Sequence, residues 1–191
     1  MVDTLRKDFE IFRDHCVFLR GTHNTFYSLY GKGETQKILV KAAVWFFDDL
    51  YRIFADSFFV QVGRICDSPK TYGNANLSLS YIVEELERLG LSTEEIKSLE
   101  NSILTFNTLT KGARNKAVAH TDVKSVRKGG LLGVHTQEES ESFFKDLNEF
   151  TDKVAKQLGL DPLDYSVQAG RGDAIDLIRL LRKATEQRNA Q

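Results

Sequence analysis

The chain has 191 residues, of which 41 % are apolar and 28 % charged, and its formal net charge is −1. This length suffices for one domain with a substantial core, with or without an appendage, and the composition is that of a soluble globular protein. The near-neutral charge gives no global reason to expect a nucleic-acid partner, so any such site has to come from a local cluster of charge.

Cysteine usage and hydropathy exclude several classes of protein. Cys16 and Cys66 form no CxxC pair and no disulfide framework, which argues against a structural zinc site and suits a reducing compartment. The N-terminus lacks the basic and apolar regions of a signal peptide. The most hydrophobic stretch, 38–66, is interrupted by charged residues and so cannot span a bilayer. We therefore expect a cytoplasmic protein with no membrane partner.

Apolar periodicity and the presence of only two prolines predict an all-α fold. In chain order, helices are expected at 3–30, 34–66, 78–89, 92–121, 136–158 and 173–187. The second is apolar on most sides, which is typical of the central helix of a bundle. On its polar edge, Asp48, Arg52 and Asp56 follow at four-residue intervals and favour a ladder of salt bridges.

Capping signals and turn formers set the expected boundaries. Capping boxes are predicted at Ser92–Glu95 and Thr136–Glu139, and Asp173 is expected to cap the last helix. The turn-rich segments are 67–77, a glycine-containing loop or hairpin at 123–135, and a linker at 161–172. The stripes expected to be buried include Ile96, Leu99, Ile103, Phe106 and Leu109 in the fourth helix, and Ile175, Ile178 and Leu181 in the last.

These elements predict an antiparallel helical bundle over residues 1–159, followed by a linker and an amphipathic C-terminal helix over 160–191. The last helix either packs on the bundle or reaches a neighbouring subunit. The chain has no P-loop, no G-x-S-x-G elbow and no Glu-x-x-His pair. We therefore predict neither a bound metal nor another cofactor.

The segment 114–120 carries the most informative chemistry of the chain. Within seven residues it contains Arg114, Asn115 and His120, in a region (111–128) whose local charge is +5 while the remainder sums to −6. An arginine neutralises phosphate with a fixed fork of donors, and a histidine moves protons near neutral pH. Reactions at a phosphodiester need both. The alternative is a solvated helix end, where Arg114 pairs with a surface carboxylate and His120 caps the helix.

The string Arg114-Asn115-x4-His120, on the penultimate long helix of a bundle, resembles the signature of the HEPN superfamily (higher eukaryotes and prokaryotes nucleotide-binding domain). The surrounding sequences Arg64-Ile65-Cys66-Asp67, Leu77-Ser78-Leu79 and His120-Thr121-Asp122 resemble its abortive-infection U-type (Abi) branch. The resemblance covers about residues 5–155.

This resemblance implies a HEPN-like bundle that forms a homodimer in which the two motif helices face each other. In active members it implies metal-independent cleavage of RNA at the composite site between the two chains. By this analogy the catalytic residues are His120, Arg114 and Asn115, and the RNA-binding residues are Lys116, Lys124 and Arg127. Asp122 could hold the tautomer of the His120 imidazole.

Three functional hypotheses follow. The first is a HEPN-type endoribonuclease toxin in phage defence or a toxin–antitoxin pair, with RNA, a second copy of the chain and an antitoxin protein as partners. The second is a non-catalytic HEPN domain that binds a nucleotide, RNA or a partner protein. The third is a helical scaffold whose dimer surface is its only function. His15, His23 and His135 have no comparable neighbours in sequence, so each is interpreted as structural or solvent-exposed.

Overall fold

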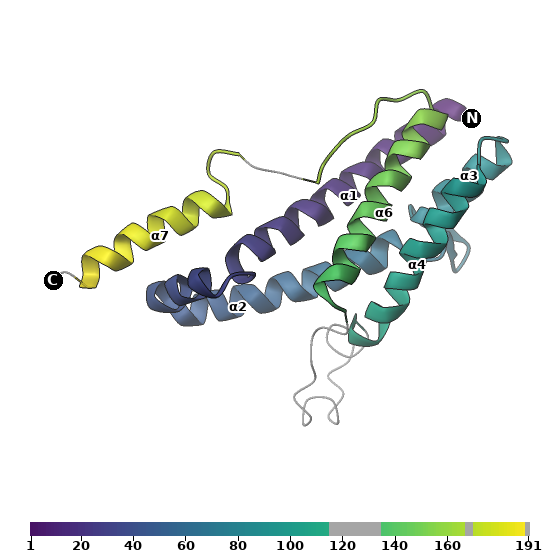
Figure 1. Ribbon diagram of the computed structural model, residues 1–191. Helices are drawn as coiled ribbons and strands as arrows, with labels where there is room; N and C mark the ends of the chain where they lie inside the picture. Colours follow the sequence, from purple (N-terminus) through teal and green to yellow (C-terminus); the bar gives the residue numbers. More distant parts are fainter. Residues whose placement is uncertain (115–134, 167–169, 190–191) are drawn as a thin grey trace.

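The computed structural model describes residues 1–114, 135–166 and 170–189 (Figure 1). Its helices are α1 (Val2–Tyr30), α2 (Gly33–Ile65), α3 (Leu79–Arg88), α4 (Glu94–Arg114), α6 (Gln137–Gln157) and α7 (Ala174–Asn189), and its strands are β1 (Lys70–Thr71) and β2 (Asn74–Ala75). The prediction of an all-α bundle is confirmed. No helix within the described ranges combines the length and the hydropathy that a membrane-spanning segment requires.

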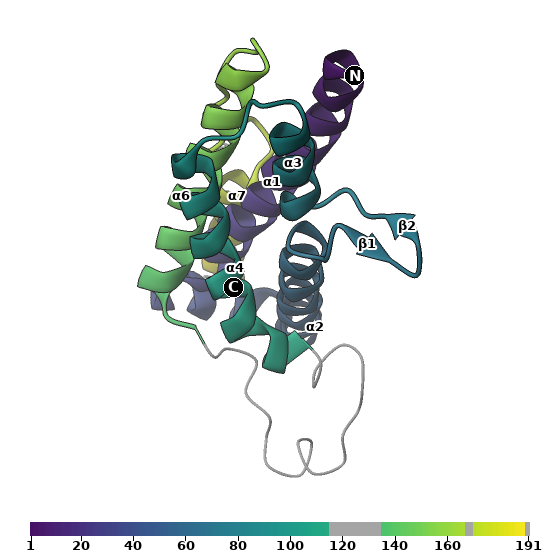
Figure 2. The ribbon, with the colours of Figure 1, turned by 90° about the vertical axis from the view of Figure 1, so that its right-hand side faces the viewer.

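The main core lies between α1, α3, α4, α6 and the C-terminal half of α2 (Figures 1 and 2). Along α1, apolar side chains recur every three or four residues and are at most 2 % exposed: Leu5, Phe9, Phe12, Cys16 and Leu19. This spacing places them on one face of the helix. The ring of Phe12 meets that of Phe150 in α6 edge to face, with 6.2 Å between centroids.

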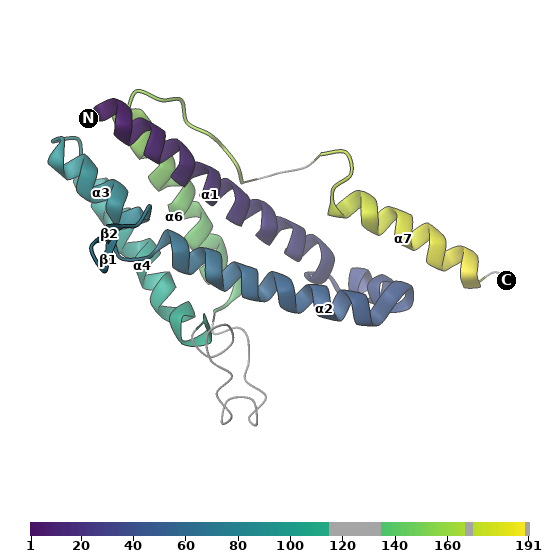
Figure 3. The same cartoon turned by 180° about the vertical axis from the view of Figure 1, so that it is seen from behind.

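Helix α2 is central along only part of its length. Its backbone departs from helical geometry at Ala43 (φ −164°, ψ 77°), and several large side chains before and after this kink are exposed, among them Trp45 at 80 % and Phe46 at 61 %. From Phe58 to Ile65 most apolar side chains are buried, and only Val60 is exposed, at 40 %. The prediction that the whole of 34–66 is central was therefore wrong for its first half. The reason is that α4 and α6 meet α2 near Phe58, whereas the described neighbours of its first turns are α1 and α7 (Figure 3).

The C-terminal helix packs on its own chain. Ala174, Ile178 and Leu181 of α7 contact a small second cluster formed by Leu29, Leu39 and Phe47. Of the two alternatives, packing on the bundle and reaching a neighbour, the structure shows the first. Ile175 is 44 % exposed and does not belong to the buried stripe, contrary to expectation.

Residues 158–166, which follow α6 and are called the strap below, are held along α1 by three arginines spaced seven residues apart. Arg6 donates from Nε to the carbonyl of Leu158 (2.7 Å), Arg13 to that of Asp161 (3.0 Å), and Arg20 to that of Ser166 (3.2 Å). Seven residues are about two helical turns, so the three side chains project from one face. Tyr165 belongs to the strap, and its side chain is buried, with the hydroxyl 3.0 Å from Oγ1 of Thr151.

Most of the predicted helix caps are present. Thr136 and Glu139 form a capping box at the start of α6, and Oδ1 of Asp173 accepts from the amides of Ile175 and Asp176. At α4 the capping residue is Thr93, whose Oγ1 accepts from the amide of Ile96. The capping box expected at Ser92–Glu95 was therefore wrong, because the third residue after Thr93 is Ile96, which has no carboxylate to return the bond.

Three smaller predictions can also be compared with the structure. Arg52 pairs with Asp48 at 2.9 Å, which confirms one step of the predicted ladder on α2, while no pair joins Asp56 to it among the described residues. Leu109 is 39 % exposed and so falls outside the buried stripe of α4. Segment 67–77 forms more than a turn, because β1 and β2 pair antiparallel around Tyr72 and Gly73, which both have positive φ (50° and 85°).

Removal of the Phe12 ring tests the main core. We expect Phe12→Ala to lower the free energy of unfolding by about 3–5 kcal/mol, because the ring is fully buried and its loss leaves a cavity beside Phe150. Urea denaturation measures the change. The matched control is Phe18→Ala on the same helix, where the ring is 65 % exposed and the expected change is within about 0.5 kcal/mol. Equal losses in both variants would contradict this assignment of the core.

Candidate functional site

The residues expected to do chemistry follow the last described turn of α4. Arg114 is the final residue of α4, and its side chain lies outside the described part of the structure. Asn115 and His120, with the expected RNA-binding residues Lys116, Lys124 and Arg127, lie outside the described residues altogether. Their predicted roles therefore stay predictions.

Residues 115–134, called the motif segment below, connect the end of α4 to the start of α6. These two helix ends lie side by side in the bundle. The end of α4 and the start of α6 are neighbours in Figures 1 and 2, and the rings of Phe106 and Phe143 stack at 4.4 Å between centroids. Near the end of α4, Thr110 is buried and its hydroxyl donates to the carbonyl of Asn107 at 3.1 Å. The motif segment thus begins and ends at one well-packed end of the bundle.

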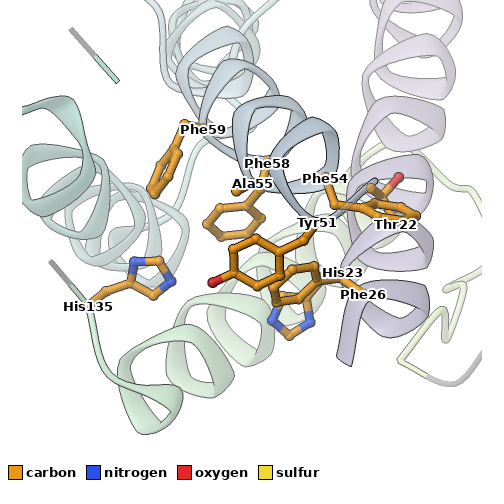
Figure 4. Close-up of a pocket in the computed structure, with 9 residues that line it drawn as sticks. All are labelled: Thr22, His23, Phe26, Tyr51, Phe54, Ala55, Phe58, Phe59 and His135. Carbon is orange, nitrogen blue, oxygen red and sulfur yellow. The ribbon is translucent and has the colours of Figure 1, made fainter. Parts of the chain in front are cut away.

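A cavity of about 220 Å³ opens at this end of the bundle (Figure 4). Its walls come from α1, from the middle of α2 and from His135, which is the first described residue after the motif segment. The described residues that line this aromatic cavity are Thr22, His23, Phe26, Tyr51, Phe54, Ala55, Phe58, Phe59 and His135.

The two histidines of the aromatic cavity both pack against one phenylalanine. The Phe58 ring is 5.8 Å from the His23 ring and 5.5 Å from the His135 ring, and the latter pair is nearly parallel, with 29° between planes. His135 also meets Phe106 of α4 edge to face at 5.4 Å. One aromatic network therefore joins α1, α2, α4 and the start of α6.

Burial disfavours the protonated form of both imidazoles. Burial lowers the pKa of His23 to about 4, and the positive charge of Arg20 and the proximity of His135 act in the same direction. Burial also lowers the pKa of His135, against a weaker opposite effect of Glu139. The Nδ1 atoms of both rings are buried and have no hydrogen-bond partner among the described residues.

Arg20 lies behind one wall of the aromatic cavity and, in addition to burial, lowers the pKa of His23. Its guanidinium lies 4.6 Å from the centroid of Phe144, whose ring is in turn 4.6 Å from that of His23. Burial lowers the pKa of Arg20, and its Nε is already engaged by the carbonyl of Ser166. Arg20 therefore supplies positive potential behind the aromatic wall and is not itself a lining residue.

Sequence reasoning missed the meeting of His23 and His135. Both were interpreted as structural or solvent-exposed, and both are in fact partly buried in the wall of a cavity. His15, assigned in the same way, is partly buried against Phe18 and Ile65, apart from the aromatic cavity. No group of three metal-ligating side chains occurs within residues 1–114, 135–166 and 170–189.

Comparison with protein families assigns the chain. The family model described as HEPN_AbiU2 (AbiU2) matches residues 3–177. The chain belongs to this family. The match confirms the resemblance read from the Arg114–His120 string and its surroundings, and it extends beyond the expected 5–155 to the strap and the first turn of α7. Membership indicates an abortive-infection context. Searches of curated proteins and of solved structures found no match.

The lowered pKa of His23 has a consequence for stability. Between pH of about 6.5 and about 4 the unfolded chain binds a proton at His23 that the folded chain does not, so the free energy of unfolding falls as pH is lowered through this window. Above it, His23 contributes no pH dependence. We expect His23→Gln to reduce the slope, with a residual slope of the same sign from His135. Urea denaturation at several pH values measures it.

An NMR titration of the His23 ring in the folded protein provides the direct control. The expected midpoint is near pH 4. A midpoint near the ordinary value of 6.5 would contradict the buried, neutral imidazole.

Proposed function

We propose that this member of the HEPN_AbiU2 family is a metal-independent endoribonuclease that acts in phage defence or as the toxin of a toxin–antitoxin pair. The observation that carries the proposal is the family match over 3–177, which spans the whole Arg114–His120 string. In the proposal, RNA is the substrate, and an antitoxin protein is the partner that restrains the activity.

The chemistry fits the residue types of the motif. Attack by a ribose 2′-hydroxyl on the adjacent phosphate needs a base for the hydroxyl proton, an acid for the departing 5′-oxygen and positive charge on the transition state. His120 handles the proton, Arg114 holds the phosphate, and Asn115 orients either group. One chain supplies one His120, whereas two chains related by a two-fold axis supply two. The proposed enzyme is therefore a homodimer with its site between the motif helices.

Positive charge near the motif serves to attract RNA. Lys116, Lys124 and Arg127 belong to the segment whose local charge is +5, in a chain that is otherwise net negative. Such a segment gathers phosphate contacts where the rest of the surface repels them. In the proposal, these three residues bind the RNA backbone without reading its sequence.

The described residues support this proposal because they are well packed where the chain enters and leaves the motif segment. The end of α4 and the start of α6 are joined by stacked Phe106 and Phe143, and the aromatic cavity lies at the same end. A positioned general base and a positioned arginine need a rigid support, which such packing offers. The same cavity also favours the second candidate function, a non-catalytic HEPN domain that binds a nucleotide or RNA.

Cleavage of RNA by purified protein separates the two functions. With single-stranded RNA and excess EDTA we expect cleavage by the unmodified protein. We expect a loss of about 100-fold or more in His120→Ala, because the proton-transfer group is removed. We expect a similar loss in Arg114→Lys, because lysine lacks the planar fork. The control is His15→Ala, which removes an imidazole outside the motif. Inhibition by EDTA would contradict the proposed mechanism, and binding without cleavage would favour the binding domain.

The salt dependence of RNA binding tests the basic segment. We expect Lys124→Ala and Arg127→Ala each to reduce the slope of log affinity against log salt concentration by about 0.7, the value for one phosphate contact on a single strand. Fluorescence anisotropy with labelled RNA and catalytically inactive His120→Ala protein gives the slopes. Lys7→Ala, which removes an exposed charge on α1, is the matched control. An unchanged slope in both test variants would exclude these residues as phosphate contacts.

A further inference from the structure

The aromatic cavity has the walls of a stacking site. The Phe58 ring packs against both the His23 and the His135 ring, and Phe26 and Tyr51 approach each other at 5.3 Å between centroids on the neighbouring wall (Figure 4). Tyr51 is 38 % exposed, so this wall reaches the surface. Flat π-faces of this kind favour a planar aromatic ligand.

The hydrogen-bonding groups of the cavity distinguish among planar ligands. The described lining includes two imidazoles, those of His23 and His135, and the hydroxyl group of Tyr51. A neutral imidazole offers one donor and one acceptor. A purely apolar ligand would leave these polar atoms unsatisfied, at a cost in free energy, whereas the edge of a nucleobase presents both donors and acceptors.

The volume of the cavity and the lack of charge in its described lining limit which ligands can enter it. At about 220 Å³ the cavity is smaller than the roughly 300–1,000 Å³ of typical ligand pockets, so it accommodates a single ring system and not a whole nucleotide. No carboxylate, lysine or arginine is among its described lining residues. A phosphate would lose its hydration there without gaining a charged partner. The ring enters, and a sugar and phosphate stay outside.

We propose that the aromatic cavity binds a nucleobase, which stacks against the ring of Tyr51 and hydrogen-bonds to the imidazoles of His23 and His135. The base belongs either to a strand of RNA or to a free nucleoside. In the first case the inference rests on the proposed ribonuclease function, since the cavity adjoins the ends of α4 and α6 that border the motif segment. A base held here would select where a strand is bound.

Titration of the full-length protein with the four ribonucleosides tests the proposal. We expect at least one nucleoside to shift the ring resonances of both His23 and His135 in NMR spectra, and ribose 5-phosphate, which has no base, to shift neither. Indole and toluene serve as apolar probes. If toluene binds as tightly as every nucleoside, or if no nucleoside shifts the two rings, the assignment is overturned.

Two variants change the cavity in opposite ways. Tyr51→Ala removes a stacking face at a partly exposed position, and Ala55→Leu places a larger side chain in the cavity without removing a wall. We expect each to weaken nucleoside binding about tenfold or more. Tyr72→Ala removes a fully exposed tyrosine in the β1–β2 hairpin and should leave binding unchanged. Retained affinity in folded Tyr51→Ala and Ala55→Leu proteins would overturn the proposal.

Single-stranded homopolymers distinguish the two sources of the base. If the base belongs to a strand, wild-type protein prefers one homopolymer and Ala55→Leu loses that preference. If the source is a free nucleoside, binding of the nucleoside is lost in Ala55→Leu while affinity for the homopolymers is unchanged. Nucleoside binding without RNA cleavage would refute the ribonuclease and leave the cavity assignment intact. Cleavage without nucleoside binding would refute the cavity assignment alone.

Discussion

The aromatic junction of Phe58, Phe106 and Phe143 is the contact on which the candidate site depends. Phe106 stacks on Phe143 and meets Phe58 edge to face at 6.4 Å, so one group of rings ties together α2, α4 and α6. Its location matters as much as its strength, because α4 ends and α6 begins at this side of the bundle. Of these rings, Phe58 also lines the aromatic cavity, together with His23 and His135. Phe58 therefore belongs both to the core packing and to the cavity wall, so a substitution of this residue would affect both.

The two ends of the molecule are stabilised in different ways. At the N-terminal end of α1, buried aliphatic and aromatic side chains form a continuous core, and the arginines at positions 6, 13 and 20 bind the carbonyls of the strap. At the other end, α7 covers α1 and the first half of α2 through a small cluster around Leu29, Leu39 and Phe47. The family match continues beyond the bundle to residue 177, in the first turn of α7.

Charged and neutral side chains have separate roles in the two proposals. The segment 111–128 concentrates positive charge, whereas the described lining of the cavity contains no charged side chain. Phosphate and base are the two parts of a nucleotide that need such different surroundings, the first a cation and the second a stacking face with neutral hydrogen-bonding groups. The proposed ribonuclease and the proposed base site are thus complementary in chemistry, although each stands on its own observations.

What the sequence determined by itself was local. Helix periodicity, the box at Thr136–Glu139 and the cap at Asp173 depend on neighbours within about one turn, and for that reason they could be predicted. The family resemblance was likewise readable from Arg114, His120 and their surroundings. Tertiary structure decided which helices meet. Periodicity defines the apolar face of α2 but not the length over which α4 and α6 cover it, so the exposure of Trp45 was unforeseen. His23 and His135 meet only because α1, α2 and α6 converge on Phe58, a contact between residues too distant in sequence for any local pattern to indicate.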